Sequence, residues 1–194
     1  MEQYYPQFHE ILNLTYPVDL KESSDVFSIF SHEKIRKHNH FLVADEIPQK
    51  IGIVIKGVFR YYYLSENGIE YTKHFSDESQ FIVSYSAALQ NKHSNYYIQA
   101  LENSEILSAP FKGFIDKIES LPYGQIILRR VAEWMLSVKI EREGDLLLLD
   151  ATERYKKFIK SSPHLINRIN QYYIASYLGI TPESLSRIRK NLLS

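Results

Sequence analysis

QYYIASYLGITPESLSRIRK, residues 171–190, holds two short helical segments with a tight turn between them. In the first segment Ile174 and Leu178 lie four residues apart, and Gly179 follows where the C-terminus of a helix needs a left-handed residue. Thr181 is a suitable N-cap and Pro182 fits the first helical position, so a second helix begins almost at once. The stretch therefore predicts two helices that cross at a tight turn.

The spacing of small and apolar residues in this stretch is that of a DNA-binding helix-turn-helix. With Gln171 as position one, Ala175 is fifth, where two crossing helices approach most closely. Gly179 is ninth, at the turn, and Leu185 and Ile188 are fifteenth and eighteenth, in the core. A helical hairpin of purely structural purpose needs the same residues, so the spacing alone leaves both interpretations open.

The outer face of the second helix favours DNA reading over the structural hairpin. Arginine can bind guanine through two hydrogen bonds and glutamate can accept from cytosine, so Arg187 and Glu183 are the predicted base-reading residues. Hydroxyl and cationic groups hold phosphates, and this role is predicted for the flanking residues Thr181, Ser184, Ser186, Arg189 and Lys190. The alternative is that Glu183 and Arg187 form only a surface ion pair one helical turn apart, worth a few tenths of a kcal/mol.

The charge distribution agrees with a polyanion-binding C-terminal part. The whole chain has no net charge, with 23 basic and 23 acidic residues among 194. From Asp150 to Ser194, however, there are eight basic and three acidic residues, a net charge of +5, so the rest of the chain carries −5. A basic segment attached to an acidic body is typical of a polyanion-binding module joined to a sensing or scaffolding domain, although solvated basic helix faces are also common.

The part of the chain before residue 110 predicts helices followed by a β-domain. Residues 7–37 have a helical pattern, and from about residue 40 short segments rich in Ile, Val, Tyr and Phe indicate strands of an antiparallel barrel or jelly roll. These segments are HFLVADE, GIVIKGVFRYYYL, IEYTKHF, FIVSYS, NYYIQAL and EILSAP. Between two of them, Asn67 and Gly68 predict a type I′ hairpin turn, because both residues tolerate positive φ.

A long amphipathic helix is expected over residues 121–144, ending near Gly144. Its apolar positions Ile127, Val131, Trp134 and Val138 recur every three to four residues and can pack on the chain's own barrel or on the same helix of a second copy. Asp150, three residues before Glu153, forms the pattern of a capping box and predicts the start of a further helix and of a C-terminal domain, with Pro163 beyond the end of that helix.

From Ala151 to Lys190 the sequence resembles short members of the CRP/FNR superfamily, the cyclic-AMP receptor protein and fumarate-nitrate regulator group. The matching segments are ATERYKKFIK, NRINQYYIASYLGIT and PESLSRIRK. The resemblance implies an α+β fold with an N-terminal antiparallel jelly roll of the cyclic-nucleotide-binding kind (residues 1–120), a long dimerisation helix (121–144) and a C-terminal helix-turn-helix domain (145–194). It implies a homodimeric transcription regulator that binds double-stranded DNA through Glu183 and Arg187, responds to a small-molecule effector and has RNA polymerase as a candidate partner.

Two departures from this family's pattern affect the predicted DNA contacts. Pro182 stands where many members have a further base-reading arginine, so the half-site is expected to differ from theirs. After Lys190 the sequence NLLS leaves no room for the β-hairpin wing of longer members, so weaker and more salt-sensitive binding is expected.

The sequence of the barrel argues against cyclic AMP as its effector. Family members that bind cyclic nucleotides hold the phosphate with a Gly-Glu pair and an Arg-Ala pair, but the corresponding window, residues 76–100, has neither glycine nor arginine. Ser84, Tyr85 and Ser86, with Lys92 and His93 nearby, are the candidate lining of a different pocket, or are loop surface.

A cupin-like jelly roll that binds a metal or another ligand, with a helical tail for association only, is the competing interpretation. His38, His40 and Glu46 precede Gly52 in an order like that of a cupin metal motif, and His74 is the candidate third histidine. The Glu and Gly spacings differ from the motif and its second half is missing, so we predict no metal and no cofactor. There is no cysteine, no catalytic-triad order, no P-loop, no signal sequence and no long apolar run, so a cytoplasmic protein without enzymatic activity is expected.

Overall fold

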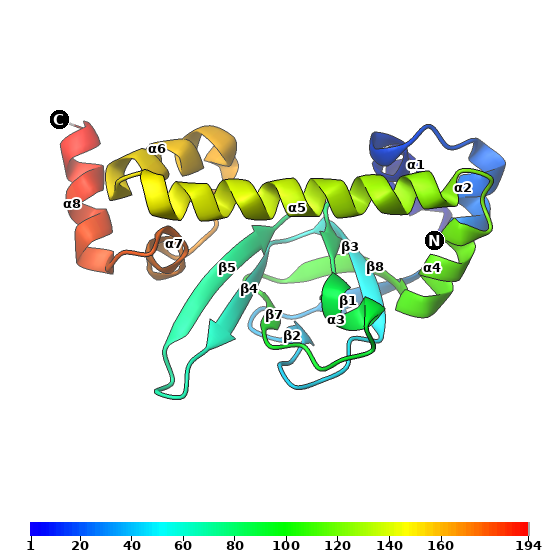
Figure 1. The fold of residues 1–194 in the computed structure, drawn as a ribbon, viewed down its shortest axis with the longest axis horizontal. Helices are drawn as coiled ribbons and strands as arrows, with labels where there is room; N and C mark the ends of the chain where they lie inside the picture. Colours follow the sequence, from blue (N-terminus) through cyan, green and yellow to red (C-terminus); the bar gives the residue numbers. More distant parts are fainter. Residues whose placement is uncertain (194) are drawn as a thin grey trace. The chain divides into compact units, whose positions relative to one another are not determined.

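A computed structural model describes residues 1–193; Ser194, the last residue of the predicted 145–194 domain, lies outside the described residues. The chain begins with helices η1 (Glu2–Tyr4), α1 (Tyr5–Thr15) and α2 (Leu20–Phe27). Eight strands follow, with one short helix, α3 (Tyr85–Leu89), between the sixth and the seventh. The strands are β1 (Ser31–Ile35), β2 (His40–Leu42), β3 (Lys50–Lys56), β4 (Phe59–Leu64), β5 (Glu70–Ser76), β6 (Phe81–Ile82), β7 (Tyr97–Ala100) and β8 (Ser104–Pro110). The remaining helices are α4 (Phe111–Glu119), α5 (Gly124–Leu148), α6 (Ala151–Ser161), η2 (Pro163–Leu165), α7 (Gln171–Leu178) and α8 (Pro182–Leu193). Figure 1 labels all of these except η2.

The strands form two four-stranded antiparallel sheets, in the orders β1-β8-β3-β6 and β2-β7-β4-β5. Strands far apart in sequence pair directly, as in Glu33 with Ile106 and Gly52 with Ser108. Two four-stranded antiparallel sheets and a long helix, α5, are the elements that the predicted fold requires. The expected antiparallel jelly roll and long helix are therefore present.

By the contacts between its residues, the chain divides into two compact units. The first contains residues 1–61 and 75–134, and the second contains residues 62–74 and the described residues from 135 on. The second unit therefore combines the tip of the β4–β5 hairpin with the C-terminal half of α5 and with α6, α7 and α8.

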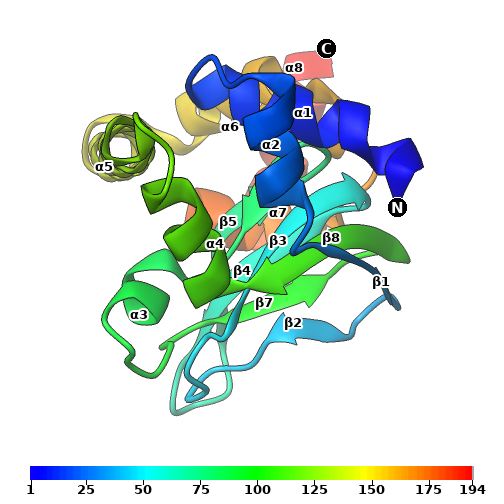
Figure 2. The same ribbon diagram turned by 90° about the vertical axis from the view of Figure 1, so that its right-hand side faces the viewer.

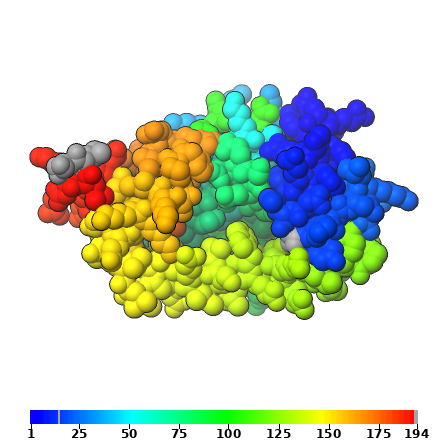
Figure 3. Space-filling view, turned by 90° about the horizontal axis from the view of Figure 1, so that it is seen from above, coloured from blue at the N-terminus to red at the C-terminus, as the bar shows by residue number. Residues whose placement is uncertain are grey.

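Two apolar clusters build the first unit. One lies inside the roll, where Val54, Phe59, Ile82, Ile98 and Ile106 are fully buried. The other lies on the outer face of the β1-β8-β3-β6 sheet, which α1, α2 and α4 cover (Figure 2). Its buried members come from these helices, from strands β3 and β8 and from the first turns of α5, which lie beside α1 and α2 in Figure 3.

The expected helical region over residues 7–37 is wrong in its second half. α2 ends at Phe27, and residues 31–35 form strand β1, which pairs with β8. The mixed-charge sequence SHEKI suggests an exposed helix, but pairing with a strand about 70 residues away overrides this local preference. In the same way, only Phe81 and Ile82 of the expected strand FIVSYS are extended, and residues 85–89 turn into α3.

The hairpin between β4 and β5 is present, but its turn differs from the expected type I′. Gly68 has φ of 76°, whereas Asn67 is not among the described residues with positive φ. The amide of Gly68 donates to the carbonyl of Ser65 (2.9 Å), and the amide of Ser65 donates to the carbonyl of Ile69 (2.9 Å). The turn therefore needs one left-handed residue, and glycine supplies it, as in hairpins whose turn is followed by a glycine bulge.

The long helix runs further than expected. α5 continues through Gly144 and ends at Leu148. A glycine stops a helix when it adopts the left-handed conformation, and Gly144 does not. The capping box after it is confirmed: the Asp150 carboxylate accepts from the Glu153 amide and the Glu153 carboxylate accepts from the Asp150 amide, each at 2.9 Å.

Candidate nucleic-acid interface

The two helices predicted from residues 171–190 form with the expected ends. α7 ends at Leu178, and Gly179 follows with φ of 69°, which is the left-handed conformation that glycine adopts at little cost. The Thr181 hydroxyl accepts from the amide of Ser184 (3.2 Å), which caps α8 as it begins at Pro182. The N-cap, the first-turn proline and the C-terminal glycine are all confirmed.

The inner faces of α7 and α8 pack into the core of the second unit. Ala175, Leu178 and Leu185 have no exposed surface, and Ile174 is 2 % exposed. The small side chain of Ala175 permits close packing of its helix, as the spacing required. From α6, buried Tyr155 and Phe158 complete this core, and the ring of Phe158 packs against that of Tyr177 with centroids 5.6 Å apart.

The outer face of α8 brings the predicted base-reading residues to the surface. Glu183, Arg187 and Lys190 are exposed, and so is Ser186, while Ser184 and Arg189 are half-buried. The Arg187 guanidinium donates to the Ser184 hydroxyl at 3.3 Å. Both predicted base-reading residues, Glu183 and Arg187, therefore lie on a helix face that a polyanion can reach.

Glu183 carries its negative charge at neutral pH. Hydrogen bonds from its own backbone amide and from the Thr181 hydroxyl, together with the charge of Arg187, lower the pKa of the Glu183 carboxyl. Among the described residues Glu183 and Arg187 do not form an ion pair, and Arg187 contacts Ser184 instead. The alternative in which these two residues serve only as a surface ion pair is therefore not the arrangement found.

Some basic side chains of the C-terminal part form ion pairs or hydrogen bonds within the second unit. Lys157 pairs with Glu141 (2.6 Å) and Asp145 (2.7 Å) on α5, and these carboxylates raise the pKa of the lysine. Arg154 donates to the carbonyl of Leu178 at the end of α7 (3.0 Å). The charge count of the C-terminal part therefore overstates the positive charge that remains for a polyanion, to which Arg187, Arg189 and Lys190 of α8 contribute.

Sequence reasoning missed two contacts that hold α7. The Arg142 guanidinium of α5 lies over the Tyr177 ring, 4.0 Å from its centroid, and donates to the Tyr177 carbonyl; burial lowers the pKa of Arg142. Ser176 of α7 accepts from the Thr72 amide of β5 (2.9 Å) and donates to the Glu70 carbonyl (3.1 Å). The only local indication of the second contact is that Ser176 is a polar residue next to the apolar positions of α7.

The residues predicted to form a dimer contact differ in their exposure along α5. Ile127 is 3 % exposed and belongs to the core of the first unit, Val131 and Val138 are half-buried, and Trp134 is 63 % exposed. The apolar side chains that sequence reasoning missed are Leu136, Ile140, Leu147 and Leu148, which are 57–84 % exposed. Large apolar side chains exposed along one helix mark a surface that another molecule can cover.

The candidate effector residues lie at the start of α3. Ser84 is buried and accepts from the Ser94 hydroxyl (3.1 Å), while Tyr85 packs edge-on against Phe111 and burial raises the pKa of its hydroxyl. Ser86 accepts from the side-chain amide of Gln90 at 3.0 Å. These three residues do not line either of two cavities in the first unit, one beside β1, β2 and β3 and one beside α2 and α4.

The histidines of the cupin-like motif do not share a strand. β2 begins at His40, and His38 lies before it in a turn with φ of 70°. Within residues 1–193, no three His, Asp or Glu side chains are grouped so that they could hold a metal ion. None of the described helices is both long enough and apolar enough to cross a membrane.

Comparison with solved structures identifies the class of the fold. The catabolite activator protein of Thermus thermophilus matches with 18 % identity and a TM-score of 0.59, over 93 % of this chain and 86 % of that one. The c-di-GMP-responsive global regulator CLP of Xanthomonas campestris matches with 13 % identity and a TM-score of 0.68 (90 % and 92 %). FixK2 of Bradyrhizobium japonicum matches with 19 % identity and a TM-score of 0.68 (84 % and 84 %).

The chain therefore has a CRP/FNR-type fold. No protein-family model matches its sequence, and comparison with curated proteins finds no match.

Proposed function

We propose that this chain is a sequence-specific DNA-binding transcription regulator of the CRP/FNR type, that it acts as a homodimer, and that it has no enzymatic activity. The observation that carries the proposal is the exposed face of α8, where ionised Glu183, Arg187 and Lys190 point away from a packed α7–α8 pair. CLP, similar in fold, is described as a global regulator. A regulator of this kind must reach chromosomal DNA, so we propose that it is cytoplasmic.

In this proposal α7 and α8 form a helix-turn-helix of a C-terminal domain over residues 145–194, and α8 enters the major groove. Glu183 accepts from a cytosine and Arg187 binds a guanine, and these contacts set the sequence preference. Thr181, Ser184, Ser186, Arg189 and Lys190 hold or flank the phosphates.

The homodimer in this proposal forms through α5. Exposed Trp134 shares one face of this helix with half-buried Val131 and Val138, and a second copy of the helix offers the same apolar side chains. Sedimentation analysis should show a dimer, and Trp134→Glu should shift the protein to monomers while Glu133→Gln should not. A monomeric parent protein would refute this part of the proposal.

The DNA-binding part of the proposal is tested by selecting random duplex DNA with the purified protein. We expect a palindrome whose half-sites lie about one helical turn apart. Arg187→Ala should lose about 1–3 kcal/mol of discrimination at one base position, whereas Lys190→Ala should weaken binding to all sequences alike and reduce its salt dependence.

Lys21→Ala, which removes an exposed cation from α2, serves as the matched control and should leave both properties unchanged. An unchanged sequence preference in Arg187→Ala would show that this residue does not read a base. RNA polymerase is tested as a partner by transcription from a template that carries the selected site. The yield of transcript should differ between reactions with and without the regulator.

The effector in this proposal is not cyclic AMP. The window of residues 76–100 offers no arginine for the phosphate and no glycine whose backbone could approach it. Addition of cyclic AMP should therefore leave both the thermal midpoint and the affinity for the selected DNA unchanged.

A further inference from the structure

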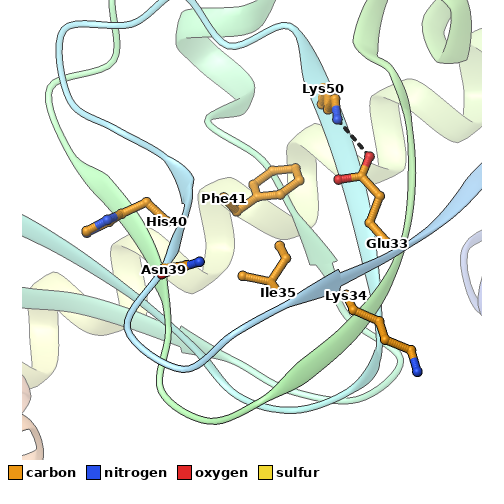
Figure 4. A pocket seen from close by; sticks show the side chains of 7 residues that line it. All are labelled: Glu33, Lys34, Ile35, Asn39, His40, Phe41 and Lys50. Carbon is orange, nitrogen blue, oxygen red and sulfur yellow. Dashed lines mark hydrogen bonds and ion pairs between the residues drawn. The ribbon is translucent and has the colours of Figure 1, made fainter.

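A cavity of about 280 Å³ lies in the first unit where β1, β2 and the start of β3 meet (Figure 4). It is lined by Glu33, Lys34, Ile35, Asn39, His40, Phe41 and Lys50. These residues differ from Ser84, Tyr85 and Ser86, the predicted effector residues. The cavity is slightly smaller than the range of about 300–1,000 Å³ in which drug-sized ligands bind, so it suits a small metabolite better than a nucleotide.

Opposite charges stand side by side in this cavity. Lys50 Nζ lies 2.7 Å from Glu33 Oε1, and the buried Ser108 hydroxyl donates to the same oxygen. Burial alone would raise the pKa of the Glu33 carboxyl, but the hydrogen bonds from Lys50 and Ser108 and the charge of Lys50 outweigh it, so the pKa is lowered. Glu33 is therefore ionised beside a cation at neutral pH.

This ion pair keeps the capacity to bind a further molecule. Within residues 1–193, no hydrogen bond reaches Glu33 Oε2, and the exposed Lys50 ammonium makes no hydrogen bond or ion pair other than that to Glu33. The side-chain amide of Asn39 has no hydrogen-bond partner among the same residues. The lining thus presents an anionic acceptor, spare ammonium donors and an amide to the same small space.

The remaining wall of the cavity is apolar. Ile35 and Phe41 are half-buried and pack against the cluster inside the roll, and Figure 4 shows both side chains beside the ion pair. Gly52 is close to Phe41, and a Cβ atom there would approach Ile82 Cγ1 to 2.8 Å and Phe41 Cε2 to 3.3 Å. A side chain at position 52 would therefore collide with Ile82 and crowd Phe41.

We propose that this cavity binds a small zwitterion with an apolar side chain, namely an α-amino acid of the leucine type. The ligand carboxylate pairs with Lys50 and the Asn39 amide, its ammonium group with Glu33 Oε2, and its side chain contacts Ile35 and Phe41. An α-amino acid carries both charges on one carbon atom, which matches a cation and an anion held 2.7 Å apart. The claim that this ligand is the effector rests on the proposed function. The claim that it binds in the cavity does not.

Calorimetric titration of the full chain with L-leucine, without DNA, tests the site. L-leucine should bind, while isocaproate, which lacks the ammonium group, and isoamylamine, which lacks the carboxylate, should each bind at least about tenfold more weakly, because each loses one charge-assisted contact. Equal binding of all three compounds, or no heat and no thermal stabilisation with L-leucine, would overturn the proposal.

Variants locate the binding. Lys50→Met and Glu33→Gln should each weaken L-leucine binding about tenfold or more, with thermal melting confirming that each variant is folded. Lys56→Met removes an exposed lysine from the other end of β3 and should leave the affinity unchanged. Equal affinity in the parent protein and in both cavity variants would place L-leucine elsewhere and overturn the proposal.

A DNA-binding measurement with and without L-leucine separates the two proposals. Loss of L-leucine binding with intact DNA binding would overturn only the ligand site, whereas L-leucine binding without any DNA binding would overturn only the proposed function.

Discussion

Ser176→Ala should destabilise the second unit by about 1–2 kcal/mol. The serine hydroxyl makes two hydrogen bonds to the backbone of β5, 2.9 Å from the Thr72 amide and 3.1 Å to the Glu70 carbonyl. At about 0.5–1.5 kcal/mol each, these bonds contribute about 1–3 kcal/mol. The better helix propensity of alanine offsets up to about 0.5 kcal/mol of that loss.

Urea and thermal unfolding at one protein concentration give the stability change, with an expected fall of the thermal midpoint of about 2–4 °C for each kcal/mol. Hydrogen exchange of the Thr72 amide gives a local reading, and its protection should fall by roughly 5–30-fold. Ser186→Ala, at an exposed position of α8, is the matched control and should change stability by less than about 0.5 kcal/mol. If Ser176→Ala behaved like this control, and Thr72 exchanged at an unchanged rate, the contact between β5 and α7 would have no energetic role.

Three further changes test local features of the fold. Asp150→Ala should cost about 1 kcal/mol in urea unfolding, because it removes the side chain that caps α6. Gly179→Ala should cost about 1–2 kcal/mol, because alanine is strained at φ of 69° although its Cβ would meet only Leu146 Cδ2, at an ordinary 3.6 Å. As the pH falls below about 4.5, the stabilisation that Glu33 provides should be lost, because its folded-state pKa lies below the 4.5 of the unfolded chain and the unfolded state then binds more protons.

Each of these predictions has a control at or near its own site. Asp150→Ser keeps a capping oxygen and should be close to the parent protein in stability. Gly179→Asn should cost less than Gly179→Ala, because asparagine tolerates the left-handed region; equal costs would contradict the role of φ. Glu33→Gln should flatten the acid limb of the stability profile while Glu66→Gln, at the exposed hairpin tip, should not, and an unchanged acid limb in Glu33→Gln would refute the titration argument.

Features set by neighbouring residues could be predicted from the sequence. The Asp150 capping box, the left-handed Gly179 and the start of α8 at Pro182 each depend on groups within a few residues, and all were expected correctly. The exposure of Glu183 and Arg187 followed from the same helical periodicity.

Features set by distant partners could not be predicted. Strand β1 is extended because β8 pairs with it, and nothing within SHEKI itself indicates this. The cavity beside Glu33 and Lys50 depends on the meeting of β1, β2 and β3, so its residues carry no common motif. The bonds of Ser176 to Thr72 and Glu70 join residues more than 100 positions apart, beyond the reach of any local pattern.

The division of the chain has a consequence for any attempt to exchange its sensing part for that of another protein. The polypeptide passes between the two compact units three times, near residues 61, 74 and 134. A chimera made with one junction in α5 would keep α7 and α8 but would receive a foreign β4–β5 hairpin, whose backbone would have to offer Ser176 the same donor and acceptor. A working exchange should therefore transplant the roll while retaining residues 62–74, which makes it a graft with three junctions.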